Sequence, residues 1–365
     1  MKRGLILSDL HLRPRINIQG KTIEGDCEAA IQSLKEFCTV IKPEFCIIAG
    51  DIFHQRTVNV EELKLFGDLM EVLTEHMNQR DVFVIQGNHD RGENAIPEVC
   101  FRTTDLTGSP QKIGNWEIIG RKYLDGDDYR EFISELRERD GARPAGAPVP
   151  NRILVLHYPC KPFSSFSESA LNPSELSGLA NIVVVGDTHT SEKYVSSAFE
   201  GTLVSPGCLF PSNIDELARK GSTGCFLCVL NDDGTHVLEK LDLCRREYVD
   251  IRNMSYTEAV NVLTSTLATK PLKTVIKAPK NSDYSDFESD YVFIRVSDTD
   301  EEKTAPEIAE TKYTMFEKID MYVSESLDGD PDIADVSKLV RDLIVTDEPR
   351  PVITGFINTK IGELK

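Results

Sequence analysis

Five short apolar runs each lead into histidine, acidic or amide side chains, and this repeated pattern constrains the fold more than any other feature. The runs end at residues 7, 48, 85, 156 and 185. Continuous apolar runs bounded by polar residues are typical of strands buried in an α/β sheet. Ligands collect beyond the carboxyl ends of such strands. The residues expected to meet there are, in chain order, Asp9, His11, Asp51, His54, Asn88, His89, His157, Asp187 and His189.

The histidines are concentrated at these strand ends. The chain has seven, and only His76 and His236 lie elsewhere. A single histidine is more often a core or surface residue than a ligand, and Gly87-Asn88-His89-Asp90 alone would be an ordinary turn. Because the pattern occurs five times, the sequence predicts a metal site.

The chemistry follows from the mixture of donors. Imidazole suits transition metals, while carboxylate and amide oxygens suit harder cations such as Mn²⁺ or Mg²⁺. The donors outnumber the needs of one ion, which indicates two ions sharing a carboxylate. Two ions about 3.5–4 Å apart clamp the attacking and leaving oxygens of a displacement at phosphorus. The predicted reaction is metal-assisted phosphoester hydrolysis.

The first half of the chain alternates strands with helices. Residues 1–54 are predicted to form a β-α-β unit whose helix spans 26–41, and a second helix is expected at 61–77. A strand at 113–119 and an acidic helix at 128–139 continue the domain.

Two segments of the second half allow competing interpretations. The aperiodic stretch 158–172 follows the predicted site directly, so it is either a substrate-contacting loop or a surface connection. Residues 225–230 and 236–241 predict a hairpin. Cys225 and Cys228 in its first strand form a CxxC pattern, but no second pair at zinc-binding spacing accompanies it, which favours buried thiols.

The C-terminal third of the chain has a different pattern of predicted helices and strands. A helix at 256–267 and strands at 273–277 and 291–296 indicate a small α+β module. Two amphipathic helices are expected after the acidic run at 298–302. Their apolar stripes either pack on their own domain or dock on a partner helix.

Hydropathy, cysteine count and net charge limit the class of protein to which the chain can belong. No run approaches the roughly 20 apolar residues of a membrane span, and no signal-peptide core follows Met1, so we expect a cytoplasmic protein without a membrane partner. The nine scattered cysteines argue against a disulfide framework. The net charge of −19 disfavours strong nonspecific duplex binding, although basic surface could be segregated or supplied by a partner.

These motifs resemble the calcineurin-like metallophosphoesterases, which show Asp-x-His, Gly-Asp, Gly-Asn-His-Asp/Glu, a lone His and Gly-His-x-His in this order. Within that superfamily the chain is most similar to SbcD-type nucleases and their phage counterparts. His54 lies three residues after Asp51, where those nucleases carry a second functional histidine. The segments 205–207, 214–216 and 220–221 are similar to a further motif of that branch.

The resemblance implies a fold and a domain organisation. The expected fold is a four-layer α/β/β/α metallophosphoesterase sandwich with a small α+β capping domain and C-terminal helices. The expected boundaries are 1–248 for the nuclease domain, 249–303 for the capping domain and 304–365 for a helical segment that docks on an ATPase.

The resemblance also implies roles for the site residues. Asp9, His11 and His189 would hold one metal, Asp51 would bridge, and Asn88, His157 and Asp187 would hold the other. His89 would protonate the leaving 3′ oxygen or stabilise the pentavalent phosphorus, and His54 would orient the substrate. The family pattern has His at position 187, so Asp187 predicts a harder second site that accepts Mn²⁺ or Mg²⁺.

The implied activity is that of an Mn²⁺-dependent DNA nuclease subunit in recombination or repair. It would be a 3′→5′ exonuclease on duplex ends with endonuclease activity on single strands. DNA, a second copy of the chain and an SbcC-like ATPase of the SMC family would be its partners. The alternatives are a stand-alone phosphodiesterase or phosphatase for a small molecule, which the acidic balance and Asp187 favour, and a metal-binding scaffold without turnover.

Overall fold

The computed structural model divides into two units, Met1–Val296 and Ser297–Lys365. It describes residues 1–296 except 19, 56–57, 91–100, 125, 142–150, 165–169, 198, 220 and 266–271. The predicted helical segment 304–365 lies outside the described residues. In the described part of the chain no helix is both long and apolar enough to cross a membrane.

The first of two large sheets contains the N-terminal strand. Its strand order is β14-β13-β1-β4-β5-β6, with β1, β4, β5 and β6 parallel and β13 antiparallel to β1. The bounds are β1 Lys2–Leu7, β4 Phe45–Ala49, β5 Val82–Ile85, β6 Thr104–Asp105, β13 Cys225–Leu230 and β14 His236–Leu241. The predicted hairpin is therefore β13–β14, and both cysteines of its first strand are buried.

The second sheet has the order β11-β12-β10-β9-β8-β7. Strands β8, β9, β10 and β12 are parallel, and β7 and β11 are antiparallel edge strands. The bounds are β7 Gln111–Ile113, β8 Trp116–Arg121, β9 Asn151–His157, β10 Ile182–Gly186, β11 Glu192–Ser196 and β12 Phe199–Ser205.

The buried side chains separate into layers because alternate residues of a strand face opposite sides of a sheet. Ile47 of β4 packs with Val155 of β9 and Val184 of β10 between the two sheets. Ile48, the next residue of β4, packs instead with helices α1 (Asp26–Ile41) and α2 (Val60–Thr74). Each large apolar side chain buried in this way contributes about 1.5–3 kcal/mol.

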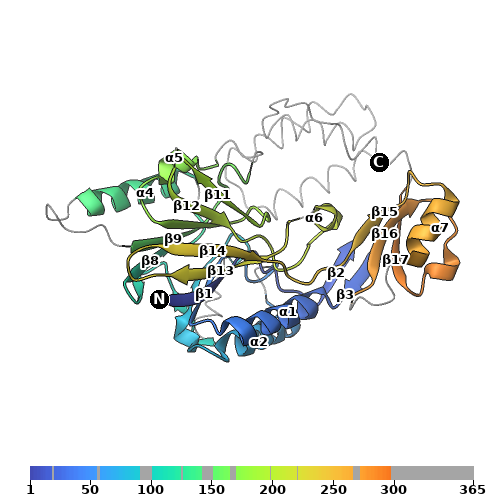
Figure 1. Cartoon of the computed structure of the whole chain (residues 1–365), viewed down its shortest axis with the longest axis horizontal. Coiled ribbons are helices and arrows are strands. Elements are labelled where there is room, and N and C mark those ends of the chain that lie inside the picture. The colour runs from blue at the N-terminus through green and yellow to red at the C-terminus, as the bar shows by residue number, and fades with distance from the viewer. Residues whose placement is uncertain are drawn as a thin grey trace, which may run out of the picture. The chain divides into compact units, whose positions relative to one another are not determined.

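The opposite outer face is covered by helices α4 (Gly126–Gly141) and α5 (Pro173–Leu176). Tyr129 and Leu176 pack there against Leu154 of β9. The resulting order of helix, sheet, sheet and helix confirms the predicted four-layer sandwich (Figure 1).

Local sequence explains the two N-terminal helices. In α1, Ala30, Leu34 and Cys38 recur every four residues and form one buried face. Helix α2 begins at a capping box, in which Asn59 and Glu62 each accept a hydrogen bond from the other's backbone N–H at 2.9 and 3.0 Å. These contacts satisfy donors that the first helical turn leaves without partners.

A hairpin that the sequence pattern did not predict interrupts the first β-α-β unit. Its strands are β2 (Arg15–Ile18) and β3 (Lys21–Glu24), with Ile16 opposite Ile23. Burial alternates along β2, where Ile16 and Ile18 are buried and the two residues between and before them are exposed. This alternation is typical of a strand, but four residues are too few for a clear periodic signal in the sequence.

The aperiodic segment 158–172 has buried residues near both ends. Tyr158 packs against Tyr129, and Cys160 forms an isolated bridge with Leu171. Its residues 165–169 lie outside the described part, and the substrate-contacting role stays a prediction.

A small sheet follows the sandwich. Its strands β15 (Tyr248–Asp250), β16 (Thr274–Pro279) and β17 (Tyr291–Val296) are all parallel, and helix α7 (Tyr256–Ser265) packs on it through Leu263. Among the described residues, the other helices are short: α6 (Ile214–Ala218) and the 3-10 turns Gln79–Asp81 and Ser285–Phe287. The boundary at residue 248 and the capping role remain predictions.

Candidate metal centre

The nine candidate residues follow the carboxyl ends of five parallel strands. β1 leads to Asp9 and His11, and β4 leads to Asp51 and His54. Residues 88 and 89 follow β5, residue 157 ends β9, and residues 187 and 189 follow β10. Both sheets therefore supply the site, and all nine predicted residues lie together.

The first group consists of Asp9, His11 and His189, whose potential ligand atoms lie within 4.8 Å of one another. The Nε2 atoms of the two histidines are 3.0 Å apart. The Nε2 of His189 is also 3.5 Å from Oδ1 of Asp9. Atoms this close to one another can bind one cation.

The second group consists of Asn88, His157 and Asp187. Nε2 of His157 lies 3.0 Å from Oδ1 of Asn88 and 3.9 Å from Oδ1 of Asp187. The group combines one imidazole with two oxygen donors.

Asp51 lies between the two groups. Its Oδ2 is 3.6 Å from Nε2 of His11 and 3.4 Å from Nε2 of His157. Its other oxygen, Oδ1, accepts a hydrogen bond of 2.8 Å from the backbone N–H of His89. One carboxylate oxygen is thus held where it can serve both groups.

Further hydrogen bonds orient the imidazole rings. Nδ1 of His157 donates to the carbonyl oxygen of Ala49 at 2.7 Å, and Nδ1 of His189 lies 2.8 Å from Oε1 of Glu216. Such partners of the distal nitrogen leave Nε2 as the ligand atom and fix the plane of the ring.

Burial and neighbouring charges shift the pKa values of the site residues, some downwards and some upwards. Burial lowers the pKa of His11 to about 3, so its ring is neutral. Burial also opposes charge on His157, but the field and hydrogen bond of Asp51 outweigh it and raise the pKa to about 10. Burial together with the charges of Asp9 and Asp51 raises the pKa of Asp187 to about 6. This concentration of buried negative charge favours a bound cation.

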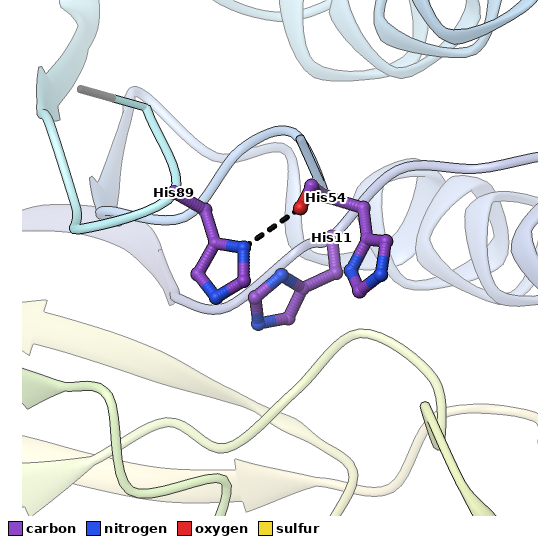
Figure 2. Close-up of side chains that lie close together, drawn as sticks. All are labelled: His11, His54 and His89. Atoms are coloured by element: carbon purple, nitrogen blue, oxygen red, sulfur yellow. Dashed lines mark hydrogen bonds between the residues drawn. The ribbon is translucent and has the colours of Figure 1, made fainter. Parts of the chain in front are cut away.

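His54 and His89 lie beside the first group (Figure 2). Their rings are stacked with centroids 5.7 Å apart, and each packs edge-on against His11. Nδ1 of His89 donates to the backbone carbonyl of His54 at 2.7 Å. Nη1 of Arg13 lies 2.9 Å from Nε2 of His54.

The backbone of the site is strained. Among the described residues, seven that are not glycine have positive φ, and five of them are predicted ligands: Asp9, His11, Asp51, Asp187 and His189. Gly50 and Gly186 explain how the loops approach so closely. A Cβ at either position would lie 2.3 or 2.5 Å from Nδ1 of His157. Strain of this kind clusters at functional sites, where the surrounding structure holds it in place.

The residues present fit divalent cations. Carboxylate, amide and imidazole donors converge in two groups, and Nδ1 of His11 is buried without a hydrogen-bond partner in the described structure. Which ion each group holds remains a prediction.

Three contributing residues were missed as site residues. Arg13 contacts His54, Glu216 contacts His189, and Asp90 accepts backbone hydrogen bonds from Ile52 and Phe53 at 3.2 and 3.1 Å. Glu216 lies in a segment that the resemblance had singled out, and Asp90 completes the Gly-Asn-His-Asp motif. Nothing in the local sequence marks Arg13.

Comparisons with known proteins identify the domain. The model of the calcineurin-like phosphoesterase family matches residues 3–191, just over half of the chain. Comparison with curated proteins gave no match.

Three solved structures are similar to the chain. A candidate 5′-nucleotidase from Staphylococcus aureus in complex with alpha-ketoglutarate has a TM-score of 0.40 and 11% identity, over 71% of this chain and 56% of that one. The protein TT1561 of Thermus thermophilus has a TM-score of 0.40 and 12% identity, over 66% and 98%. The NAD nucleotidase of Haemophilus influenzae has a TM-score of 0.38 and 12% identity, over 79% and 58%. The chain thus spans little more than half of both nucleotidase structures, and family membership rests on the family model alone.

Proposed function

This chain belongs to the calcineurin-like phosphoesterase family, and we propose that it hydrolyses phosphoester bonds at a centre that holds two divalent cations. The observation that carries the proposal is the position of Asp51, whose Oδ2 lies within 3.6 Å of a histidine of each ligand group. A carboxylate shared by two donor groups is the arrangement that a pair of closely spaced cations requires.

The proposed ligands divide between the two cations. Asp9, His11 and His189 would hold the first, Asn88, His157 and Asp187 the second, and Asp51 both. The donors are mainly oxygen and imidazole, which supports Mn²⁺ with Mg²⁺ as the alternative. The bound cations would activate a water molecule and neutralise the phosphoryl oxygens.

His89 is the proposed proton donor. Its Nδ1–H is held by the carbonyl of His54, so Nε2 is the nitrogen that exchanges a proton with substrate. Nε2 lies 4.0 Å from Oδ2 of Asp51, and the side chain is 38% exposed, so a substrate can reach it. A general acid at this position would protonate the leaving oxygen, which typically contributes about 10²–10⁴-fold to the rate.

The first candidate substrate is a DNA phosphodiester. The support is His54, a second histidine stacked beside His89, where a diester has an additional substituent to orient. The SbcC-like ATPase and the homodimer belong to this candidate, and the segment expected to bind the ATPase lies outside the described residues. The family assignment covers phosphoesterases in general and does not single out DNA.

The second candidate is a small-molecule phosphoester, such as a nucleotide. The net charge of −19 favours it, because affinity for duplex DNA depends largely on lysine and arginine contacts to phosphate. It also requires no partner to supply basic surface.

A parallel assay distinguishes the candidates. Purified full chain is given Mn²⁺ and either an end-labelled DNA duplex, a chromogenic phosphodiester or a nucleoside monophosphate, with and without a co-expressed ATPase. His89→Ala is compared with His236→Ala, which removes a histidine of β14 that contacts Thr202 and Trp116.

Three outcomes are informative. Release of 3′ nucleotides from the duplex, lost in His89→Ala but kept in His236→Ala, supports the nuclease candidate and the role of His89. Hydrolysis of the small substrates while the duplex survives every condition supports the second candidate. Mn²⁺ binding without hydrolysis of any phosphoester would contradict the proposed function.

A further inference from the structure

Arg13 forms a fixed bridge next to the candidate site. Its Nη1 lies 2.9 Å from Nε2 of His54, and its Nη2 donates to the carbonyl oxygen of Ser212 at 2.9 Å. A guanidinium carries only donors, so Nε2 of His54 must accept. A neutral imidazole has one N–H, which leaves the hydrogen of His54 on Nδ1.

That hydrogen has no acceptor among the described residues. Nδ1 of His54 is buried without a hydrogen-bond partner, although it belongs to a ring packed against His11 and His89. Buried donors are nearly always paired in folded proteins. An unpaired donor beside two candidate site residues indicates an acceptor that arrives with the substrate.

The three histidines His11, His54 and His89 also have the spacing of a metal cluster. Arg13 argues against a third cation there, because its positive charge lies in contact with His54 and its N–H occupies the Nε2 lone pair. Positive charge and an unpaired N–H instead suit an anionic oxygen.

We propose that Arg13 is a positioning residue, which holds His54 in its neutral Nδ1–H form so that this hydrogen is donated to a phosphoryl oxygen of the substrate. The proposal rests on the proposed phosphoester hydrolysis. It adds that a residue outside the ligand set decides which nitrogen of His54 faces the substrate.

The second hydrogen bond of Arg13, from Nη2 to Ser212, explains why arginine suits this position. The backbone N–H of Ser212 donates to Oε2 of Glu216 at 2.6 Å, and Oε1 of Glu216 contacts His189. Arg13 therefore connects His54 to the same segment that orients His189. A planar fork with two separate donor nitrogens fixes this geometry, whereas lysine offers all its donors from one nitrogen on a flexible stem.

The first test is spectroscopic and needs no activity. Full chain labelled with ¹⁵N-histidine is examined by long-range ¹H–¹⁵N correlation, which reports the protonated ring nitrogen, and His54→Gln identifies the His54 signal. Wild type should show Nδ1–H, and Arg13→Met should shift the signal towards Nε2–H. Arg15→Met is the matched control, because the side chain of Arg15 pairs, within the described part of the chain, only with the exposed Glu24 on the neighbouring hairpin strand. An Nε2–H signal in wild type, or one unchanged in Arg13→Met, would overturn the proposal.

The second test is kinetic. Arg13→Met should lower kcat by about 10–100-fold, the usual effect of losing a partner that orients a site histidine. KM should change little, because the donated hydrogen bond strengthens as charge develops on the phosphoryl oxygens. Arg13→Lys should fall between wild type and Arg13→Met. Equal kcat in Arg13→Met and Arg15→Met would refute the role.

A third comparison holds even where Arg13→Met fails to fold. The amide of His54→Asn lies near the Nδ1 position, whereas that of His54→Gln reaches towards Nε2. His54→Asn should therefore retain more activity, and the reverse order would overturn the proposal. A wild type inactive on every phosphoester would instead refute the proposed function and the contact with substrate. The tautomer measurement would then still show whether Arg13 determines the protonated nitrogen of His54.

Discussion

The two ligand groups of the site differ in chemistry although they share Asp51. The first group has two imidazoles and one carboxylate, whereas the second has one imidazole, an amide oxygen and the carboxylate of Asp187. Nitrogen donors favour later transition metals, and oxygen donors favour Mg²⁺ and Mn²⁺. The difference indicates that the two positions bind cations with unequal affinity and selectivity.

The groups also differ in how their histidines are supported. His157 is fully buried, and a backbone carbonyl at the end of β4 holds its distal nitrogen. His189 is 23% exposed, and the side chain of Glu216 holds it. His157 is therefore anchored in the core of the sandwich, whereas the orientation of His189 depends on a side chain that mutation can remove.

Removing the shared carboxylate should have the largest effect. Asp51→Asn takes the charged bridge from both groups, so hydrolysis should fall by about 10³-fold or more, as expected when cation stabilisation of several kcal/mol is lost. Equilibrium dialysis should show weaker Mn²⁺ binding at both positions. Asp68→Asn on the exposed side of α2 is the control. Loss of only one bound ion would show that the groups do not share Asp51.

Removing the support of His189 should affect one group alone. Glu216→Gln keeps the size of the side chain but loses its charge, and the affinity of the first group for Mn²⁺ should fall by about 10–100-fold. The second group should be unchanged, so a Mn²⁺ titration should separate into two phases. An equal loss at both positions would contradict the independent support inferred for His157.

Changing the donor type in the second group should have the smallest effect. Asp187→His replaces a carboxylate with an imidazole and restores the pattern of the family resemblance. The ratio of Zn²⁺ to Mg²⁺ affinity at this position should rise by about tenfold, following ligand preference. Competition calorimetry measures this ratio, and Asp187→Asn, which keeps an oxygen donor, should not raise it. An unchanged ratio in Asp187→His would show that residue 187 does not face the cation.

Much of the sandwich and the members of the site could be predicted from the sequence. The runs ending at Leu7, Ile48, Ile85, Leu156 and Val185 are continuous and short, and such runs become buried parallel strands whose carboxyl ends meet. This is why residues as distant in sequence as Asp9 and His189 could be assigned to one place. A separate argument, the spacing of apolar residues along one helical face, predicted helix 26–41 at the bounds of α1.

The contacts around the ligands could not be predicted in the same way. Arg13 reaches Ser212, 199 residues away, and no periodicity marks a contact between two loops. The sequence marked Glu216 only as part of a segment that resembles a family motif. Its contact with His189 could not be predicted, because it depends on how the chain runs from β12 to α6. The β2–β3 hairpin was missed because its strands are four residues each.

The left-handed backbone at five of the proposed ligands has a consequence for protein engineering. Each such residue costs about 1–3 kcal/mol, which glycine would largely relieve. A selection for thermal stability alone should therefore enrich glycine or asparagine at positions 9, 11, 51, 187 and 189 and discard the donors that the proposed chemistry uses. A stabilised version of this enzyme should be sought by changing residues elsewhere in the sandwich.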